Sequence, residues 1–461
     1  MSPINIDLMQ CSTEGLTAPL VRNFRMSATI ISSSYDKSVR FWDPATGKAM
    51  RSFTFESSQV NCMALSPDRT RLAVGGNSSL KLYDVSTAVN CPPCVGGYEN
   101  QQAGNFTTLG FISVAKEVVG RSLLYSGSED GVIRTLEVRS AACRVVKEAC
   151  VNVMITCSAI NALNQMLAVG TQIGKIFVWD LQSLVGDASA PKPMQEISFA
   201  DDRSATRSIA FGPSVTWAAV ATNNGKVHCL RLAKDIHKQQ PQTAAANTPT
   251  TDRETISPTI NAPDTDEGEP MPLLGSPLPR AAESQGPETP QQQQLDDAEH
   301  ANSPAQKPTD AKVVVLTPKQ AELELQLFNR IQAHHKYILR VNISPDGRLM
   351  ATCSADYTIK LWSLPEELWN DEPSGARTPL PAAVGPADSA GFIPLKSLQG
   401  HTRWVWDCAF SECSKVLVTV SSDNYVRLWT DLTELKRKSD PLVGHQKPVT
   451  CVLFEYLEAK K

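Results

Sequence analysis

One spacing recurs along the chain and limits its fold more than any other feature. In three segments, SYDKSVRFWD, SADYTIKLWS and SSDNYVRLWT, an Asp precedes a Trp by six residues: Asp36 and Trp42, Asp356 and Trp362, and Asp423 and Trp429. The same offset relates four weaker pairs, each reached through an alternating apolar stretch: Asn77 and Tyr83, Asp130 and Leu136, Ile173 and Trp179, and Asn223 and Cys229. Seven copies of one unit predict a repeat architecture in which neighbouring units bury each other's apolar faces.

The segments around these pairs have the pattern of short β-strands. They are rich in Val, Ile, Leu and Thr, are separated by turn residues and show little helical periodicity. The clearest are 72–75, 80–84, 123–126, 176–181, 416–420 and 426–429. We therefore predict an all-β fold, a single seven-bladed β-propeller with four strands in each blade.

Two histidines lie at a second fixed offset, since His334 and His401 each precede the turn Asp of their unit by 22 residues. At these residues the sequence resembles the WD40 family, whose repeats carry a GH or AH dipeptide, an Asp turn and a strand ending in WD or a relative. The resemblance implies a buried polar network of imidazole, Asp, a Ser two residues before the Asp, and the indole N–H. The expected sets are His334, Ser354, Asp356 and Trp362, and His401, Ser421, Asp423 and Trp429.

The two ends of the sequence carry complementary fragments of one unit. The first unit has Ser34, Asp36 and Trp42 but no upstream His, whereas the last fragment, GHQKPVTCVLF, has His445 and one strand. Joined in space, the fragments complete one blade. We therefore expect the N- and C-terminal strands to pair, with His445 facing Asp36, which removes two free sheet edges.

A narrower resemblance lies in the runs RFWD, VNCMALSPD, MATCSADYTIKLW, WVWDCAFS and VSSDNYVRLW with the terminal GHQKPV. Over 28–232 and 329–454 the sequence is similar to the family of small WD-repeat subunits of target-of-rapamycin kinase complexes. The resemblance implies a non-catalytic scaffold that binds and stabilises the kinase domain in TORC1 and TORC2, supporting nutrient and growth signalling, with the kinase and the other complex subunits as partners. The alternative is a WD-repeat adaptor of another assembly, either a ubiquitin-ligase substrate receptor or a ribosome-associated scaffold.

Composition divides the chain into six parts. We expect an N-terminal extension (1–25), blades 1 to 5 (26–235), a disordered insertion (236–317), the outer strand of blade 5 with blade 6 (318–364), a loop (365–392), and the outer strand of blade 6, blade 7 and the closing strand (393–456). The insertion lacks aromatic residues and is crowded with Pro, Gln and acidic residues, so it cannot bury enough apolar surface to order itself. Just after it, 322–328 favours a strand over a helix beginning at Thr317.

Six Ser-Pro or Thr-Pro pairs lie in or beside this insertion and are candidate phosphorylation sites: Thr248, Ser257, Ser276, Thr289, Ser303 and Thr317. Composition alone accounts for them equally well.

Both insertions follow a third strand, so they should leave the ring on one face and keep the other face clear. On the clear face we expect aromatic, Arg and amide residues of the kind that anchor protein interfaces. The predicted partner-binding residues are Gln59, Asn61, Tyr337, Arg403, Trp404, Trp406, Asn424 and Tyr425, with Lys37, Tyr357, Gln446 and Lys447 nearby. The sequence leaves open which of the two tryptophans is exposed.

Charge and motifs argue against other classes of function. The formal net charge of -4 offers no positive field for nucleic acid, and no apolar run is long enough for membrane insertion. Cysteines within apparent strands favour a reduced compartment, so we expect a cytoplasmic protein that reaches endomembranes only through its complex. The CPPC pair Cys91 and Cys94 lacks a second half-site for zinc, and no catalytic motif appears. We expect no cofactor, no metal, no catalytic residue and no small-molecule substrate.

Overall fold

The structure is a computed structural model that describes residues 26–86, 89–112, 122–139, 142–161, 163, 165–185, 191–199, 203–232, 324–368, 391–430, 432, 437–438 and 440–458. The N-terminal extension, the insertion at 236–317 with its six Ser/Thr-Pro sites, and most of the 365–392 loop lie outside the described residues.

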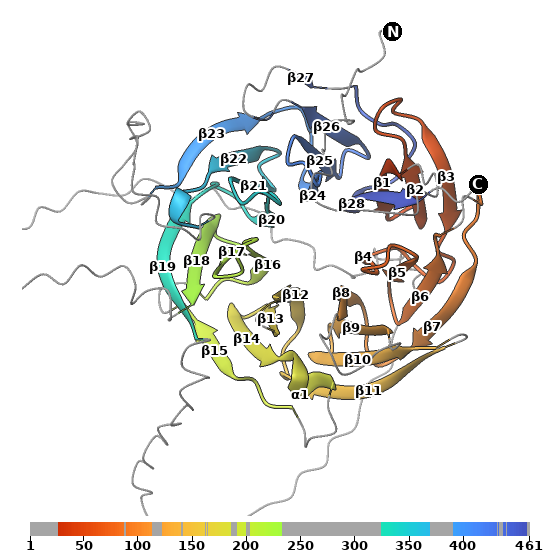
Figure 1. Ribbon diagram of the computed structural model, residues 1–461, viewed down its shortest axis with the longest axis horizontal. Coiled ribbons are helices and arrows are strands. Elements are labelled where there is room, and N and C mark those ends of the chain that lie inside the picture. The colour runs from red at the N-terminus through yellow and green to blue at the C-terminus, as the bar shows by residue number, and fades with distance from the viewer. Residues whose placement is uncertain are drawn as a thin grey trace, which may run out of the picture. The chain divides into compact units, whose positions relative to one another are not determined.

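Within the described residues, seven four-stranded antiparallel sheets stand around one axis (Figure 1), which confirms the predicted seven-bladed β-propeller. From the axis outward, blade 1 contains β28 (Val449–Glu458), β1 (Met26–Ser34), β2 (Ser38–Trp42) and β3 (Ala49–Thr54). Blade 2 contains β4 (Cys62–Leu65), β5 (Arg71–Gly75), β6 (Ser79–Asp84) and β7 (Cys94–Glu99). Blade 3 contains β8 (Phe106–Ile112), β9 (Ser122–Ser128), β10 (Val132–Val138) and β11 (Cys143–Cys150).

The remaining blades repeat this order. Blade 4 contains β12 (Ile155–Asn161), β13 (Met166–Thr171), β14 (Lys175–Asp180) and β15 (Gln195–Ser198). Blade 5 contains β16 (Thr206–Phe211), β17 (Trp217–Thr222), β18 (Lys226–Leu232) and β19 (Leu325–Gln332). Blade 6 contains β20 (Ile338–Ile343), β21 (Leu349–Ser354), β22 (Ile359–Ser363) and β23 (Ile393–Leu398), and blade 7 contains β24 (Val405–Phe410), β25 (Val416–Ser421), β26 (Val426–Thr430) and β27 (Arg437–Lys438).

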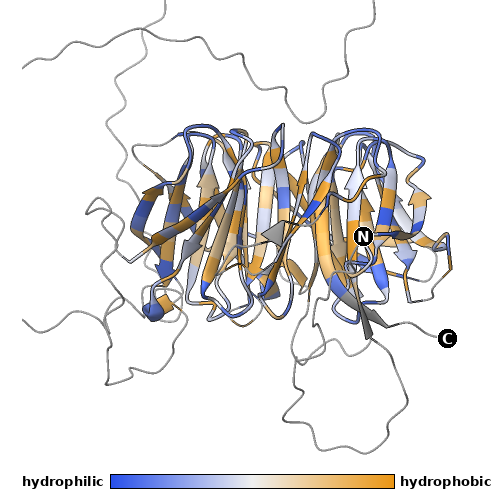
Figure 2. Cartoon of the chain, turned by 90° about the horizontal axis from the view of Figure 1, so that it is seen from above, coloured by the Kyte–Doolittle hydropathy of each residue, from blue (hydrophilic) through white to orange (hydrophobic). Residues whose placement is uncertain are grey.

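Burial changes systematically from the middle of a blade to its rim. The second strands β13, β17, β21 and β25 are buried at all six of their residues, because adjacent blades cover both faces of the sheet. The outer strand β11 alternates between buried and accessible residues, as a half-covered strand does. The core therefore consists of apolar clusters between adjacent blades. Figure 2 shows hydrophobic residues along the strands and many hydrophilic residues in the loops at the two faces.

The ring closes through blade 1. β1 pairs with β28 on one side, with Ile31 opposite Leu453, and with β2 on the other, with Ile31 opposite Phe41. Side chains of this blade pack both ways, since Ile30 joins the cluster with blade 7 and Ile31 joins the cluster with blade 2. The predicted pairing of the N- and C-terminal strands is confirmed.

Three details differ from the sequence expectations. The strand expected at 322–328 begins at Leu325 and continues to Gln332. Leu181, expected to end a strand, begins the short helix α1 (Leu181–Val185), which buries Leu181 and Leu184 against the core. A 3-10 helix, η1 (Glu366–Leu368), follows β22. None of the helices in the described part of the chain is long and apolar enough to cross a bilayer.

Strand direction alternates within each blade and so divides the connections between two faces. We call one of them the turn face. It carries the connections that lead into each inner strand and the tight turns between second and third strands: 35–37, 76–78, 129–131, 172–174, 223–225, 355–358 and 422–425. The other is the insertion face, because β18 ends there at Leu232 before the insertion, and β22 ends there at Ser363 before the 365–392 loop.

Candidate protein-binding face

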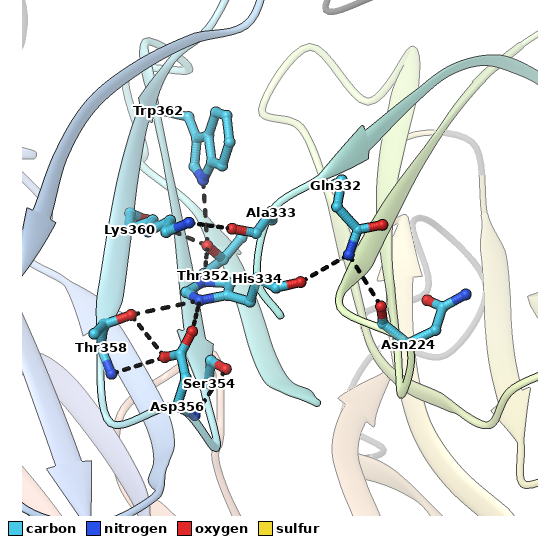
Figure 3. Close-up of polar contacts among 10 residues, drawn as sticks. All are labelled: Asn224, Gln332, Ala333, His334, Thr352, Ser354, Asp356, Thr358, Lys360 and Trp362. Atoms are coloured by element: carbon cyan, nitrogen blue, oxygen red, sulfur yellow. Dashed lines mark hydrogen bonds and ion pairs between the residues drawn. The ribbon is translucent and has the colours of Figure 1, made fainter. Parts of the chain in front are cut away.

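Blade 6 shows how a turn is fixed to the rest of its blade (Figure 3). His334 Nδ1 lies 2.7 Å from Asp356 Oδ2, and His334 Nε2 lies 2.8 Å from Thr352 Oγ1. The same hydroxyl accepts a hydrogen bond from Trp362 Nε1 at 3.2 Å. Thr358 Oγ1 donates to the other carboxylate oxygen at 2.6 Å. The chain of bonds therefore runs from the buried indole to the turn at the surface.

The bridging hydroxyl is not the one expected from the sequence. Ser34, Ser354 and Ser421 accept a bond from the backbone N–H of their turn Asp instead of joining His to Trp. The bridge is made by residues two positions earlier: Ser32, Thr352 and Thr419. The strand register explains the correction. Trp362 lies opposite Met350, so Ser354 is four residues, roughly 13 Å, further along the strand and beyond the reach of the indole.

The same network closes the ring in blade 1. His445 Nε2 lies 2.7 Å from Ser32 Oγ, and its Nδ1 lies 3.3 Å from Asp36 Oδ2. Burial lowers the pKa of His445, although Asp36 opposes this effect. Burial alone would raise the pKa of Asp36, but bonds from His445, Ser38 and the Gln446 N–H together bring this pKa well below its usual range. The clasp therefore joins a neutral imidazole to an ionised carboxylate.

Each turn between second and third strands places one residue in the left-handed backbone region. Glycine occupies this position in blades 3, 4 and 5. Lys37, Ser78, Tyr357 and Asn424 occupy it in blades 1, 2, 6 and 7, with φ between 56° and 74°. A side chain in this region costs about 1 to 2 kcal/mol relative to glycine. Turns on the insertion face hold such residues too, at Arg69, Gln165, Val215 and Ser414.

Two of the predicted partner-binding residues lie beside this turn in blade 7. The ring centroids of Trp404 and Trp406 are 5.8 Å apart, and Trp406 Nε1 donates to Ser422 Oγ at 2.6 Å. Both side chains are half-buried. A register shift between Val405 and Asp407 lifts Trp406 out of the regular strand ladder. Each ring thus supports the other and keeps part of its surface accessible.

The other predicted residues are spread over three blades of the turn face. Tyr337, Asn424, Tyr425, Gln59 and Asn61 are half-buried, and Arg403 is exposed. Asn61 Nδ2 donates to Asn105 Oδ1 at 2.9 Å, and Asn105 in turn donates to Glu129 in blade 3. Asn424 Nδ2 donates to the Gln446 carbonyl at 3.3 Å, which connects blades 7 and 1. The structure thus places all eight residues on one face, over blades 6, 7 and 2.

Comparison with known families agrees with this geometry. The "WD domain, G-beta repeat" family, WD40, matches residues 47–84, 325–363 and 392–430. Each matched span runs from the outer strand of one blade through three strands of the next, for example from β23 to β26. The chain contains WD40 repeats. The offset between WD40 repeat and blade is what leaves one strand to close the ring.

Curated relatives of this chain carry related names. It is 26% identical over 333 residues to "Target of rapamycin complex subunit LST8" of Bos taurus, which covers 72% of each chain. It is 25% identical to "Protein LST8 homolog" of Drosophila pseudoobscura pseudoobscura over 92% of this chain and 95% of the relative. It is 25% identical to "Target of rapamycin complex subunit wat1" of Schizosaccharomyces pombe over 73% and 74%. The resemblance to the small WD-repeat subunits is thereby confirmed.

Two blades that lack the WD40 histidine hold their turns with other side chains, which the sequence pattern did not predict. In blade 3, Arg134 Nη2 pairs with Asp130 at 2.6 Å and Nη1 donates to Ser128 at 2.9 Å. In blade 5 the turn position belongs to Asn224, whose Oδ1 accepts from the Lys226 N–H. The expected Asn223 was wrong by one residue, because Gly225 is the left-handed residue there. Arg134 stands four residues after its Asp, and this spacing was the signal available.

A buried charged residue next to Trp406 connects three blades. Asp407, next to Trp406, forms an ion pair with Arg340 of blade 6, with 2.9 Å between Nε and Oδ1, and accepts a hydrogen bond from the Val452 N–H of blade 1 at 3.0 Å. It therefore connects three adjacent blades beneath the tryptophans. Neither charged residue was recognised in the sequence, because their pairing depends on the stacking of blades.

The sequence also singled out the two cysteines of the CPPC segment. Cys91 and Cys94 are exposed near β7, and the Cys94 thiol approaches the Gly96 carbonyl at 3.5 Å. Among the residues described, no group of three or more His, Cys, Asp or Glu is arranged to hold a metal ion.

Proposed function

We propose that this chain is a non-catalytic scaffold subunit of a target-of-rapamycin complex, which binds and stabilises the kinase domain and so supports nutrient and growth signalling. The names of its relatives support membership of such a complex. We expect it in the cytoplasm, with any contact to endomembranes made through the complex.

One observation carries the assignment of the turn face as the docking site. Trp404 and Trp406 lie on the turn face with their ring centroids 5.8 Å apart, both half-buried, and Trp406 Nε1 donates to the Ser422 hydroxyl. Half-buried aromatic side chains held by neighbours are pre-organised anchors, since little side-chain entropy is lost when a partner binds.

Affinity purification of the tagged protein followed by mass spectrometry tests the partner. We expect a very large kinase to be recovered with the wild-type protein. The double substitution Arg403→Ala with Trp404→Ala should weaken binding by tenfold or more, because an aromatic anchor contributes about 2 kcal/mol or more. The matched control is Leu163→Ala, which removes an apolar side chain 77% exposed in the connection between β12 and β13, on the insertion face.

Two results would contradict the proposal. Unchanged kinase recovery by the folded double variant would show that the docking face is wrong. Recovery of a cullin adaptor or of ribosomal proteins in place of a kinase would assign the chain to a different class of WD-repeat scaffold.

A further inference from the structure

A hollow of about 340 Å³ opens on the turn face between blades 7 and 1. We call it the basic hollow, and it is lined by Thr402, Arg403, Ser422, Asp423, Asn424, Gln446, Lys447 and Pro448. Arg403 and Lys447 are both exposed. No ion pair joins either of them to an acidic side chain of the described residues. Two exposed cationic groups therefore line one concavity.

The single carboxylate in the lining points inward. The Asp423 side chain is 3% exposed, and its Oδ2 accepts bonds from His401 Nδ1 at 2.8 Å and from the Thr402 N–H at 3.1 Å. Its Oδ1 accepts from the Tyr425 N–H at 3.1 Å. Asp36, in the adjacent turn of blade 1, is 10% exposed and bonded in the same manner to His445 and the Gln446 N–H. The hydrogen bonds of the WD40 network thus keep the Asp423 and Asp36 carboxylates largely buried, so their negative charges are shielded from the surface of these loops.

What remains at the surface is a set of donors. Beside the two cations, Gln446 is exposed and the half-buried Asn424 adds a second side-chain amide. Lys37 is exposed in the left-handed turn of blade 1 and contributes a third cation next to the hollow. The formal net charge of the whole chain is -4, so this positive potential is local and does not reflect the whole molecule.

We propose that the basic hollow receives an acidic segment of the partner kinase domain, with an Asp or Glu carboxylate between Arg403 and Lys447. The planar guanidinium of Arg403 matches a carboxylate with two parallel bonds, and the Lys447 ammonium adds a point charge. Trp404, next in sequence to Arg403, supplies an apolar contact beside the charged one. This inference rests on the proposed function, because it names the chemistry of the segment that docks on the same face.

Charge reversal tests the inference with a matched control in the same two blades. Arg403→Glu with Lys447→Glu changes the basic hollow, and Lys48→Glu with Lys415→Glu makes the same charge change on the insertion face, where both lysines are exposed. Binding to the purified kinase domain is measured at low and at high salt. We expect the first pair to weaken binding at least tenfold at low salt and to reverse its salt dependence, because salt then screens a repulsion between like charges. The second pair should leave the affinity and its salt dependence unchanged.

A zero-length carbodiimide cross-link identifies the partner group directly, since it joins a lysine amine to a carboxylate in contact. Mass spectrometry should find Lys447 joined to an Asp or Glu of the kinase domain, with Lys48 and Lys415 unlinked. The control is Lys447→Arg, which keeps the charge and should keep the affinity but loses the cross-link.

The outcomes separate the inference from the function beneath it. The proposal of an acidic segment is wrong if the complex is stable, its affinity does not depend on salt, the Arg403 and Lys447 reversal has no effect, and Lys447 forms no cross-link. The scaffold role would remain intact in that case. Failure of the wild-type protein to bind the kinase domain at any salt overturns both. Loss of binding after phosphatase treatment of the kinase domain assigns the hollow to a phosphate and overturns the carboxylate.

Discussion

At the scale of single residues, one hydroxyl in blade 6 connects two buried ring nitrogens. Thr352→Val keeps the shape of the side chain but leaves His334 Nε2 and Trp362 Nε1 without this partner. We expect the free energy of unfolding in urea to fall by about 2 to 4 kcal/mol, because each buried polar atom left unbonded costs about 1 to 3 kcal/mol. Ser354→Ala, which removes one bond to the Asp356 N–H, should cost about 1 kcal/mol. If both substitutions lowered the free energy of unfolding equally, Thr352 would not be the residue that bridges His334 and Trp362, and the original expectation for Ser354 would stand.

A second residue prediction concerns the strained turn of blade 6. Tyr357 has φ 74°, and its side chain is 42% exposed on the turn face. Tyr357→Gly relieves about 1 to 2 kcal/mol of strain but adds about 0.5 to 1 kcal/mol of chain entropy in the unfolded state. We expect the free energy of unfolding to stay constant or rise by up to about 1.5 kcal/mol, while affinity for the kinase domain falls.

The matched control for this prediction lies on the insertion face. Val215 has φ 54°, in the turn between β16 and β17, so Val215→Gly should relieve strain without changing kinase affinity. Loss of stability in Tyr357→Gly with unchanged affinity would assign the tyrosine to the fold alone.

Contacts within one repeat could be predicted from the sequence, whereas contacts that depend on strand register or on neighbouring blades could not. The His-to-Asp spacing was visible in the sequence because both residues belong to one repeat, and His334, His401 and His445 all lie at the expected Asp. The bridging hydroxyl required the register of two strands, which a count of residues does not provide. The Arg340 and Asp407 pair joins separate blades, so only the assembled ring brings it together.

At the scale of elements, the pairing of β28 with β1 depends on a histidine that is neutral in the folded state. The pKa of His445 is lowered by burial, so the unfolded chain binds more protons than the folded chain below its unfolded pKa of about 6.5. The free energy of unfolding therefore falls as the pH drops from about 6.5 toward the folded pKa. The lowered pKa of Asp36 adds its own loss only below the unfolded Asp value of about 3.9.

The measurement is urea unfolding of wild type and His445→Asn between neutral and mildly acidic pH. We expect the variant to be less stable at neutral pH but to lose less stability on acidification. His335→Asn, which removes an exposed imidazole of blade 6, should follow the wild-type slope. A variant slope parallel to that of wild type would mean that the clasp histidine does not control closure.

The elements themselves were predictable to different degrees. The second strands carry continuous apolar runs because both of their faces are buried, and β25 and β26 lie where expected. The outer strand β19 was harder, since a half-covered strand after a long polar segment alternates weakly and a proline nearby also suggested a helix. The helix α1 was missed because five residues are too few to show helical periodicity.

At the scale of the whole molecule, the ring is closed without its insertion. Leu232 at the end of β18 and Leu325 at the start of β19 are register partners, so the 92 residues between them (233–324) connect two adjacent points on one sheet. Replacing 236–321 by four Gly/Ser residues shortens this connection about ninefold. Loop-closure entropy then predicts a gain in the free energy of unfolding of up to about 2 kcal/mol.

The same replacement tests whether the two faces act separately. Because both ends of the insertion leave from the insertion face, kinase affinity should stay within about twofold of wild type, although all six Ser/Thr-Pro sites are removed. The control is a chain that carries the insertion residues in scrambled order, which preserves length and composition. Unfolding or lost binding in the shortened chain would show that the ring is not self-sufficient. Retained binding with lost signalling in cells, for the shortened but not the scrambled chain, would assign the insertion a length-dependent role outside the docking face.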